Sequence, residues 1–270
     1  MIYTLQSADG AQAQIALNGA QVISWIPAPI TGKKEQLFLS GSSSLDAGSA
    51  IRGGIPVIFP QFSNLGPLAK HGFARTQLWQ LLPSEQPGSA LFELRDNEQT
   101  RSVWPHAFLA QLKVTIAAAE LTVELTIHNT GSSTLAFTTA LHTYLRVDDI
   151  EQVRVLGLQG KSYRDSVSGV SDNLQVEDEL SIRGQIDRIY LNAADSVTVQ
   201  QAEQTLSVFG SGFADAVIWN PGADLGANLV DLEPQGYQRM LCVEAAAIAQ
   251  PVHLQAGECW RGSQRLVVQL

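Results

Sequence analysis

Residues 111–128 read QLKVTIAAAELTVELTIH and alternate between apolar and polar side chains on both sides of a short break. Every second residue is apolar from Leu112 to Ile116, and the same period resumes from Leu121 to Ile127. Because successive side chains of a β-strand point to opposite faces of the sheet, a period of two indicates a strand with one buried face. Two such strands joined by a few residues predict an antiparallel hairpin.

Similar short strand patterns recur along the chain, separated by Gly, Pro, Ser and Asn residues. Helical periodicity is limited to residues 98–103 and 245–249, each expected to form one short turn. There is no alternation of strands with helices, which argues against doubly wound and (β/α)8 folds. The sequence therefore predicts a β-sandwich or a β-barrel. The further strands are expected at residues 13–17, 22–25, 36–39, 91–94, 134–140, 197–200, 205–209, 216–219, 239–244 and 264–269.

The chain has 270 residues, of which 45% are hydrophobic and 16% charged, enough apolar material for a substantial core. Since large sandwiches run to roughly 250 residues as one domain, we expect a single domain over residues 1–270. A polar stretch at 162–179 is the best candidate for a long excursion, and it lacks the composition of a domain linker.

The charge balance bears on the partners of the protein. Lys and Arg number 17 against 26 Asp and Glu, a net charge of −9 at pH 7, which argues against nucleic acid as a partner. There is no uninterrupted apolar run of about 18 residues and no secretory signal pattern, so we expect no membrane partner and a cytoplasmic location. Two cysteines, Cys242 and Cys259, fit a reducing compartment. We expect a monomer.

Three cations and a histidine gather in one Gly- and Pro-rich stretch of this acidic chain. Arg52 precedes two glycines and a proline, and Lys70, His71 and Arg75 follow further along. The functional interpretation is an anion-binding surface beside a titratable imidazole. The alternative is a solvated loop whose charges pair with local carboxylates.

Three more features carry titratable groups. His142 lies in a strand pattern rich in β-branched residues, where it is either a proton donor and acceptor or a structural histidine. Glu244 ends an apolar strand, where it is either a buried catalytic carboxylate or a side chain turned to solvent. Asp187 and Arg188 by themselves indicate an ion pair beside a strand. Nucleotide-binding, Gly-x-Ser-x-Gly and His-Glu-x-x-His signatures are missing from the sequence.

Together these segments resemble the aldose 1-epimerase (mutarotase) superfamily, and they are most similar to its hexose-6-phosphate branch, the glucose-6-phosphate 1-epimerases. The similar segments occur in the family's order and span most of the chain. They are 51–60 (IRGGIPVIFP), 71–76 (HGFART), 141–144 (LHTY), 187–190 (DRIY), 219–221 (WNP) and 242–244 (CVE).

The resemblance implies a large antiparallel β-sandwich, the galactose mutarotase-like supersandwich, with the sugar site on a curved face. It also implies that His142 is the general acid and Glu244 the general base. Five further residues would bind substrate: Arg52 and Arg75 its phosphate, Lys70 a neighbouring position, His71 the sugar ring and Asp187 sugar hydroxyls. Gln61 and Lys70 depart modestly from the family pattern, and both bear on substrate preference.

The implied reaction interconverts the α and β anomers of glucose 6-phosphate and related hexose 6-phosphates by acid/base ring opening and closure. It needs no metal, cofactor or covalent intermediate. An aromatic residue would stack on the sugar, and Trp219, Trp104 and Phe73 are the candidates, each of which fits a core position equally well. The alternatives are a mutarotase of unphosphorylated aldoses, a non-catalytic carbohydrate-binding sandwich, and a glycoside hydrolase. The last is disfavoured because hydrolases normally use two carboxylates.

Overall fold

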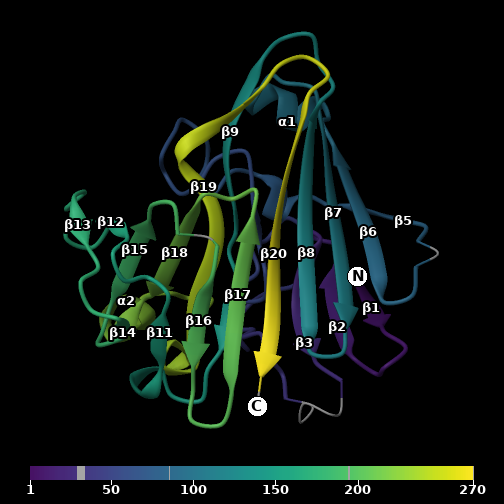
Figure 1. Cartoon of the computed structure of the whole chain (residues 1–270). Coiled ribbons are helices and arrows are strands. Elements are labelled where there is room, and N and C mark those ends of the chain that lie inside the picture. The colour runs from purple at the N-terminus through teal and green to yellow at the C-terminus, as the bar shows by residue number, and fades with distance from the viewer. Residues whose placement is uncertain (29–33, 85, 194, 270) are drawn as a thin grey trace.

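The computed structural model describes residues 1–28, 34–84, 86–193 and 195–269 of the chain (Figure 1). Its strands form three sheets, and the strand pairings among these residues are antiparallel. The prediction of an all-β antiparallel sandwich is confirmed. The helices are few and short: they are α1 (Glu98–Val103) and α2 (Gly222–Ala227), with 3-10 turns η2 (Ala74–Thr76), η3 (Ile150–Gln152) and η4 (Gly236–Arg239).

The nine-stranded sheet contains the hairpin that residues 111–128 predict. Strands β7 (Phe108–Ala117) and β8 (Glu120–Asn129) pair from Phe108 opposite Asn129 to Ala117 opposite Glu120. Buried residues alternate with half-buried ones along β7. The hairpin is therefore confirmed. The sheet order is β14 (Glu179–Ser181), β11 (Arg154–Leu156), β16 (Val197–Gln200), β17 (Thr205–Ser211), β20 (Cys259–Gln269), β8 (Glu120–Asn129), β7 (Phe108–Ala117), β6 (Ser89–Arg95) and β5 (Gln80–Leu82).

The eight-stranded sheet shares a core with it and includes β19 (Met240–Leu254), β18 (Asp215–Asn220) and β15 (Ile186–Tyr190), which are labelled to the left of β20 in Figure 1. A short strand, β10 (Tyr144–Arg146), follows β9 (Leu135–Leu141), and both pair with β19. A third sheet consists of β1 (Ile2–Gln6), β2 (Gln12–Ala16) and β3 (Gln21–Ile26). The order of the eight-stranded sheet is β13 (Asn173–Leu174), β12 (Ser162–Asp165), β15 (Ile186–Tyr190), β18 (Asp215–Asn220), β19 (Met240–Leu254), β9 (Leu135–Leu141) and β4 (Val57–Ile58).

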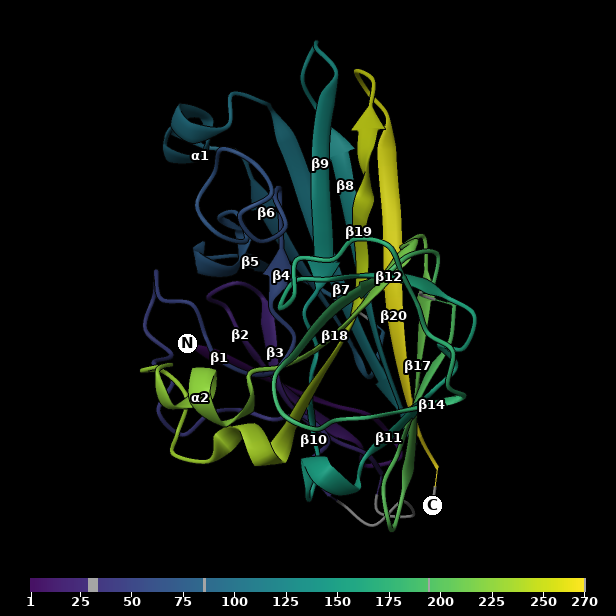
Figure 2. The ribbon, with the colours of Figure 1, turned by 90° about the vertical axis from the view of Figure 1, so that its left-hand side faces the viewer.

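The eight-stranded sheet packs against apolar residues on both of its faces, and the cavity described below lies on the outer face. Its inner face contributes Ile218 and Val243 to the main core, which Leu112 and Leu266 of the nine-stranded sheet share. Its outer face carries two smaller apolar clusters, one of which packs against the segment around α2 and η4. Figure 2 shows this segment at one end of the sheet.

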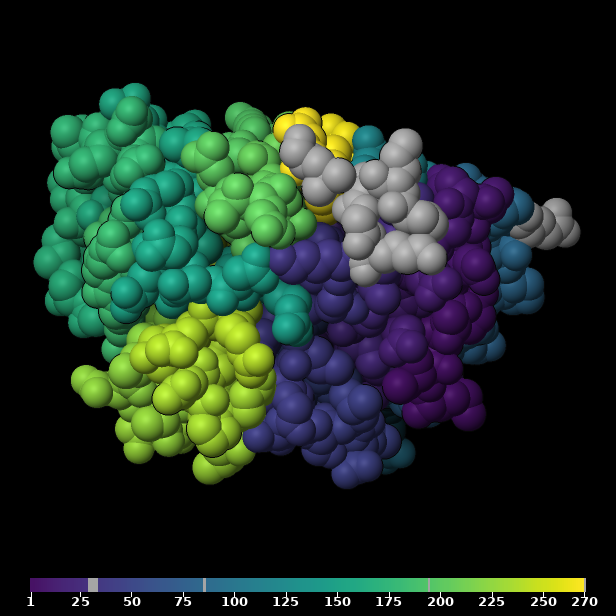
Figure 3. Space-filling view, turned by 90° about the horizontal axis from the view of Figure 1, so that it is seen from below, coloured from purple at the N-terminus to yellow at the C-terminus, as the bar shows by residue number. Residues whose placement is uncertain are grey.

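The α2–η4 segment also contacts the chain near residues 40–43. The backbone N–H of Gly41 donates to the Glu233 carboxylate (2.9 Å), and the N–H of Glu233 donates to the Ser40 hydroxyl (3.1 Å). Figure 3 shows the yellow-green residues of this segment packed beside the blue-violet ones of the early chain. One border of the cavity is therefore built from two segments far apart in sequence.

Two local predictions are wrong. Residues 245–249 lie inside strand β19, where Ala245 and Ala246 pair with Leu141 and Ala140, because cross-strand pairing outweighs the helix preference of alanine. Residues 36–39 form only isolated bridges. By contrast, the predicted turn at 98–103 is confirmed as α1, with a capping box between Asn97 and Thr100. The excursion at 162–179 contains β12 and β13 and starts β14.

Candidate active site

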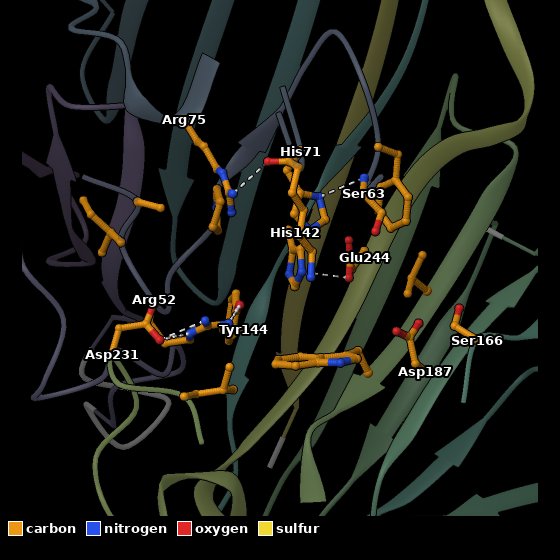
Figure 4. Close-up of a pocket in the computed structure, with 18 of the residues that line it drawn as sticks. Arg52, Ser63, His71, Arg75, His142, Tyr144, Ser166, Asp187, Asp231 and Glu244 are labelled. Atoms are coloured by element: carbon orange, nitrogen blue, oxygen red, sulfur yellow. Dashed lines mark hydrogen bonds and ion pairs between the residues drawn. The ribbon is translucent and has the colours of Figure 1, made fainter. Parts of the chain in front are cut away.

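A cavity of about 390 Å³ opens on the outer face of the eight-stranded sheet (Figure 4). Small-molecule sites typically enclose roughly 300–1,000 Å³, so the size suits a sugar. All seven site residues that the sequence predicts line this cavity. They are Arg52, Lys70, His71, Arg75, His142, Asp187 and Glu244.

The register of the sheet explains how residues far apart in sequence converge here. Residues directly opposite each other in an antiparallel pair point to the same face. Asp187 lies opposite Trp219, Trp219 opposite Cys242, and Cys242 opposite Tyr144. One row further along, Glu244 lies opposite Val217 and shares their face. Four strands thus place a carboxylate, two aromatic rings and a second carboxylate on one wall.

His142 and Glu244 form a buried pair of titratable side chains. The His142 Nε2 atom lies 3.3 Å from Glu244 Oε1, and the side chains are 11% and 1% exposed. Burial, reinforced by the charge of Asp187, raises the pKa of Glu244 well above its usual range. Burial, together with the nearby His71, Arg75 and Arg52, lowers the pKa of His142. Burial therefore disfavours the charged form of both side chains, and for the same reason a carboxylate at Glu244 is a stronger base, and an imidazolium at His142 a stronger acid, than either group in water.

The His142 ring is fixed in place by its aromatic neighbours. It stacks on Tyr144 with 4.8 Å between ring centroids and 11° between planes. Trp219 meets it edge-on at 6.0 Å, and His71 does so at 5.5 Å. Three contacts of this kind leave the imidazole little freedom to turn, so Nε2 stays directed at Glu244.

His71 is held as a neutral hydrogen-bond donor. The backbone N–H of Ser63 donates to His71 Nδ1 (3.2 Å), so the ring proton lies on Nε2. Burial and the cations Arg75, Lys70 and Arg52 lower the pKa of His71 to about 3. His71 therefore carries no charge at neutral pH.

Arg52 is anchored by side chains that the sequence does not single out. Its Nε and Nη2 atoms donate to Asp231 Oδ1 (3.1 and 2.9 Å), and its Nη1 donates to the Tyr144 hydroxyl (3.1 Å). The two glycines that follow it have positive φ angles, and a Cβ on Gly54 would lie 2.1 Å from the Val22 carbonyl oxygen. Only glycine allows this close approach, which carries Arg52 to the cavity.

Arg75 and Lys70 differ from Arg52, because neither forms an ion pair among the described residues. Among the described residues Arg75 donates only to the Lys70 carbonyl oxygen (2.9 Å), and its buried Nε has no hydrogen-bond partner there. The alternative of a loop whose charges pair with local carboxylates is therefore wrong, because Arg52 pairs with a carboxylate 179 residues away in sequence and the other two cations have no ion-pair partner among the described residues. The cavity border keeps two cations available to an anion.

Asp187 faces the cavity on the side opposite the arginines, next to Ser166 (Figure 4). Burial raises the pKa of its carboxyl, while a hydrogen bond with Ser166 and the charge of Lys70 act in the opposite direction. The predicted ion pair with Arg188 is wrong, since adjacent strand residues face opposite sides and Arg188 pairs with Asp165 instead (3.5 Å).

Several lining residues were not predicted from sequence as parts of the site. Asp231 and Ser166 lie in irregular segments without a periodic pattern, and Tyr144 carried no role beyond its place in a motif. Of the three candidate aromatic residues, Trp219 lines the cavity, whereas Trp104 is buried in the main core and Phe73 packs against it. Gln61 lies behind the cavity wall, where it bonds to the loop backbone.

The described residues lack two other kinds of feature. They contain no cluster of three or more His, Cys, Asp or Glu side chains placed to hold a metal ion. No helix among them has the length and apolar character needed to cross a membrane.

The sequence and the fold match those of known proteins. A family model described as aldose 1-epimerase matches residues 1–267, and the chain belongs to this family. It is 35% identical to a protein of Cenchrus ciliaris, covering 96% of this chain and 82% of that one. It is 36% identical to a protein of Escherichia coli strain K12, covering 87% and 79%. Both carry the provisional name glucose-6-phosphate 1-epimerase.

Solved structures agree with this assignment. A crystal structure of a Salmonella typhimurium protein, provisionally described as a mutarotase, superposes with a TM-score of 0.90 at 30% identity. The match covers 99% of this chain and 90% of that one.

Proposed function

We propose that the protein is a hexose-6-phosphate mutarotase that interconverts the α and β anomers of glucose 6-phosphate. The observation that carries the proposal is the order of groups along the cavity in Figure 4. Arg52 and Arg75 lie at one side, His142 and Glu244 in the middle, and Asp187 at the other side.

This order matches the order of atoms in the substrate. In glucose 6-phosphate the phosphate is attached through C6 to C5, which bears the ring oxygen, and C1 follows the ring oxygen. A phosphate at the arginines places the ring oxygen near His142 and the C1 hydroxyl near Glu244. The hydroxyls at C2 and C3 then extend toward Asp187, with Trp219 available to stack on the ring.

The reaction needs one proton removed and one supplied. The pair holds one proton, and in the reactive form it lies on His142. The Glu244 carboxylate takes the proton of the C1 hydroxyl while the His142 imidazolium gives its Nε2 proton to the ring oxygen, and the bond between C1 and the ring oxygen breaks. The open aldehyde rotates about the C1–C2 bond. On closure His142 takes the proton back and Glu244 returns one to O1, so no proton is consumed. His71 contributes an Nε2–H hydrogen bond to the ring oxygen as charge develops there.

Recognition of the phosphate depends on the unpaired cations. Arg75 and Lys70 offer two positive charges without ion-pair partners, and Arg52 retains free N–H groups although Asp231 balances its charge. We further propose that the chain works as one domain over residues 1–270, as a cytoplasmic monomer, on a free sugar phosphate and without a cofactor.

Exchange NMR on the sugar tests the proposal. At equilibrium, magnetisation transfer between the α and β C1–H signals of glucose 6-phosphate should be faster with the protein than without it. The same measurement on glucose and galactose should show much weaker acceleration. No acceleration with any of the three sugars would contradict a mutarotase, and equal acceleration of glucose would contradict phosphate recognition.

A further inference from the structure

One buried side-chain amide makes three hydrogen bonds across the loop that carries Ser63. Gln61 Nε2 donates to the carbonyl oxygens of Ser63 (2.9 Å) and Leu68 (3.1 Å), and its Oε1 accepts from the Leu68 N–H (2.9 Å). The loop is wrapped so closely that a Cβ on Gly66 would lie 2.4 Å from this Oε1. All three hydrogen bonds of the amide are made to backbone groups of the loop. Gln61 therefore stabilises the loop as hydrogen bonds between paired strands stabilise a sheet.

The loop reaches His71 through two hydrogen bonds. The His71 N–H donates to the Ser63 carbonyl oxygen (3.0 Å), and the Ser63 N–H donates to His71 Nδ1 (3.2 Å). Thus one residue, Ser63, fixes both the backbone and the ring of His71. Its carbonyl is also one of the two that Gln61 binds.

Both ends of this link have an uncommon backbone conformation. Ser63 has φ 47° and His71 has φ 69°, in the left-handed region that residues with a Cβ adopt only when their surroundings hold them there. Gly72 continues the turn, and a Cβ on it would lie 2.3 Å from the Phe59 carbonyl oxygen. Among the hydrogen bonds described for the loop, those of Gln61 are the ones that join Leu68 to Ser63.

We infer that Gln61 is a positioning residue that sets the tautomer and orientation of His71. By holding Ser63 in place, it keeps an N–H against His71 Nδ1, which leaves the proton on Nε2, the atom free to reach substrate. The consequence for catalysis rests on the proposed function, but the consequence for the tautomer does not.

A pair of isosteric substitutions tests this inference. Gln61→Glu keeps the acceptor for the Leu68 N–H but turns an oxygen toward two carbonyls. Asn129→Asp is the matched control, because the Asn129 amide likewise donates to two carbonyls, those of Ser133 (2.8 Å) and Leu254 (2.9 Å), and accepts from the Gly131 N–H (3.0 Å). Asn129 ends strand β8 and does not line the cavity.

The direct readout is long-range ¹H–¹⁵N correlation NMR of the His71 ring. We expect Nε2–H alone in the wild type and in Asn129→Asp, and a mixture of tautomers in Gln61→Glu. The kcat for glucose 6-phosphate should fall roughly 10- to 100-fold in Gln61→Glu and stay near the wild-type value in the control, because small displacements of a catalytic group are costly. If Gln61→Glu does not fold, Gln61→Met removes the same bonds without burying a charge.

An unchanged His71 tautomer in a folded Gln61 variant would overturn the inference, and so would an equal change in Asn129→Asp. If the wild type does not accelerate anomer exchange, the proposed function fails while the tautomer result still decides the role of Gln61.

Discussion

The eight-stranded sheet and the loop of residues 61–76 both border the cavity, but they hold their side chains by different means. The sheet places Glu244 and Asp187 through the register of paired strands, in which each position is fixed by its neighbours. The loop places His71, Lys70 and Arg75 through one amide, a few left-handed residues and a 3-10 turn. We infer that the rigid wall carries the proton transfer and the loop carries the recognition of the anion.

The two regions also differ in electrostatics. The sheet side carries two carboxyl groups, and burial raises the pKa of both Glu244 and Asp187. On the loop, Lys70 is exposed, and Arg75 has no ion-pair partner among the residues described. We therefore expect a dianionic phosphate to bind on the loop side, which leaves the sheet side for its uncharged sugar ring.

The largest effect is expected for the base. Glu244→Gln keeps the shape of the side chain and removes its ability to accept a proton, so kcat for anomer exchange should fall about 10²–10⁴-fold. The KM for glucose 6-phosphate should change little, and the urea unfolding midpoint should stay close to that of the wild type. Wild-type turnover in this variant would exclude Glu244 as the base.

His142→Asn should cause a loss of similar size in kcat. Because the acid and the base act in one step, the double variant with Glu244→Gln should be about as slow as either single variant and not the product of both losses. Exchange NMR on the three variants checks this. Fully multiplicative losses would show that the two groups act in separate steps.

A loop substitution should act on KM and on one substrate. Arg75→Ala removes charge-assisted hydrogen bonds to phosphate, commonly worth about 1.5–3 kcal/mol each, so kcat/KM for glucose 6-phosphate should fall roughly 10- to 150-fold. Arg265→Ala is the control, since Arg265 pairs with Glu120 on the other sheet (3.2 Å). An equal loss with free glucose would contradict the phosphate role of Arg75.

His71 should make stability depend on pH. Its folded-state pKa of about 3 lies below the value of 6.5 for an unperturbed histidine, so the unfolded chain binds more protons between these values. The free energy of unfolding should therefore fall on acidification, by about 2 kcal/mol from pH 8 to pH 5. His71→Asn lacks this contribution and accepts the left-handed backbone. Urea titrations at both pH values measure the difference, and parallel changes in the two proteins would refute it.

Asp187→Asn should have the smallest effect and should not discriminate between substrates. It weakens a hydrogen bond to sugar hydroxyls, so kcat/KM should fall roughly tenfold, equivalent to about 1.5 kcal/mol. Because glucose and glucose 6-phosphate share these hydroxyls, both should lose the same factor in steady-state assays. A loss confined to one sugar would place Asp187 elsewhere in the complex.

The sequence predicts the sheet better than the irregular segments, for a physical reason. Strand periodicity is local, so the β7–β8 hairpin and the bounds of β16 can be predicted from residues that lie next to each other. Residues 245–249 mislead because an alanine-rich stretch has no periodicity of its own and takes the conformation that its neighbours impose.

For the site as well, residues in local motifs can be predicted and contacts between distant segments cannot. Arg52, His71, His142 and Glu244 lie in recognisable motifs, but the anchoring of Arg52 by Asp231 depends on a contact between distant segments. No local pattern encodes such a contact. The same holds for aromatic residues, because a tryptophan against a sugar and a tryptophan in the core look alike in sequence.

One comparison tests most directly whether the loop recognises the phosphate while the sheet carries the proton transfer. The ratio of kcat/KM for glucose 6-phosphate to that for glucose should be measured side by side in the wild type, Arg75→Ala and Asp187→Asn. We expect a ratio well above one in the wild type, a fall of roughly 10- to 150-fold in Arg75→Ala, and an unchanged ratio in Asp187→Asn. A ratio that is unchanged in Arg75→Ala, or that falls in Asp187→Asn, would contradict the account.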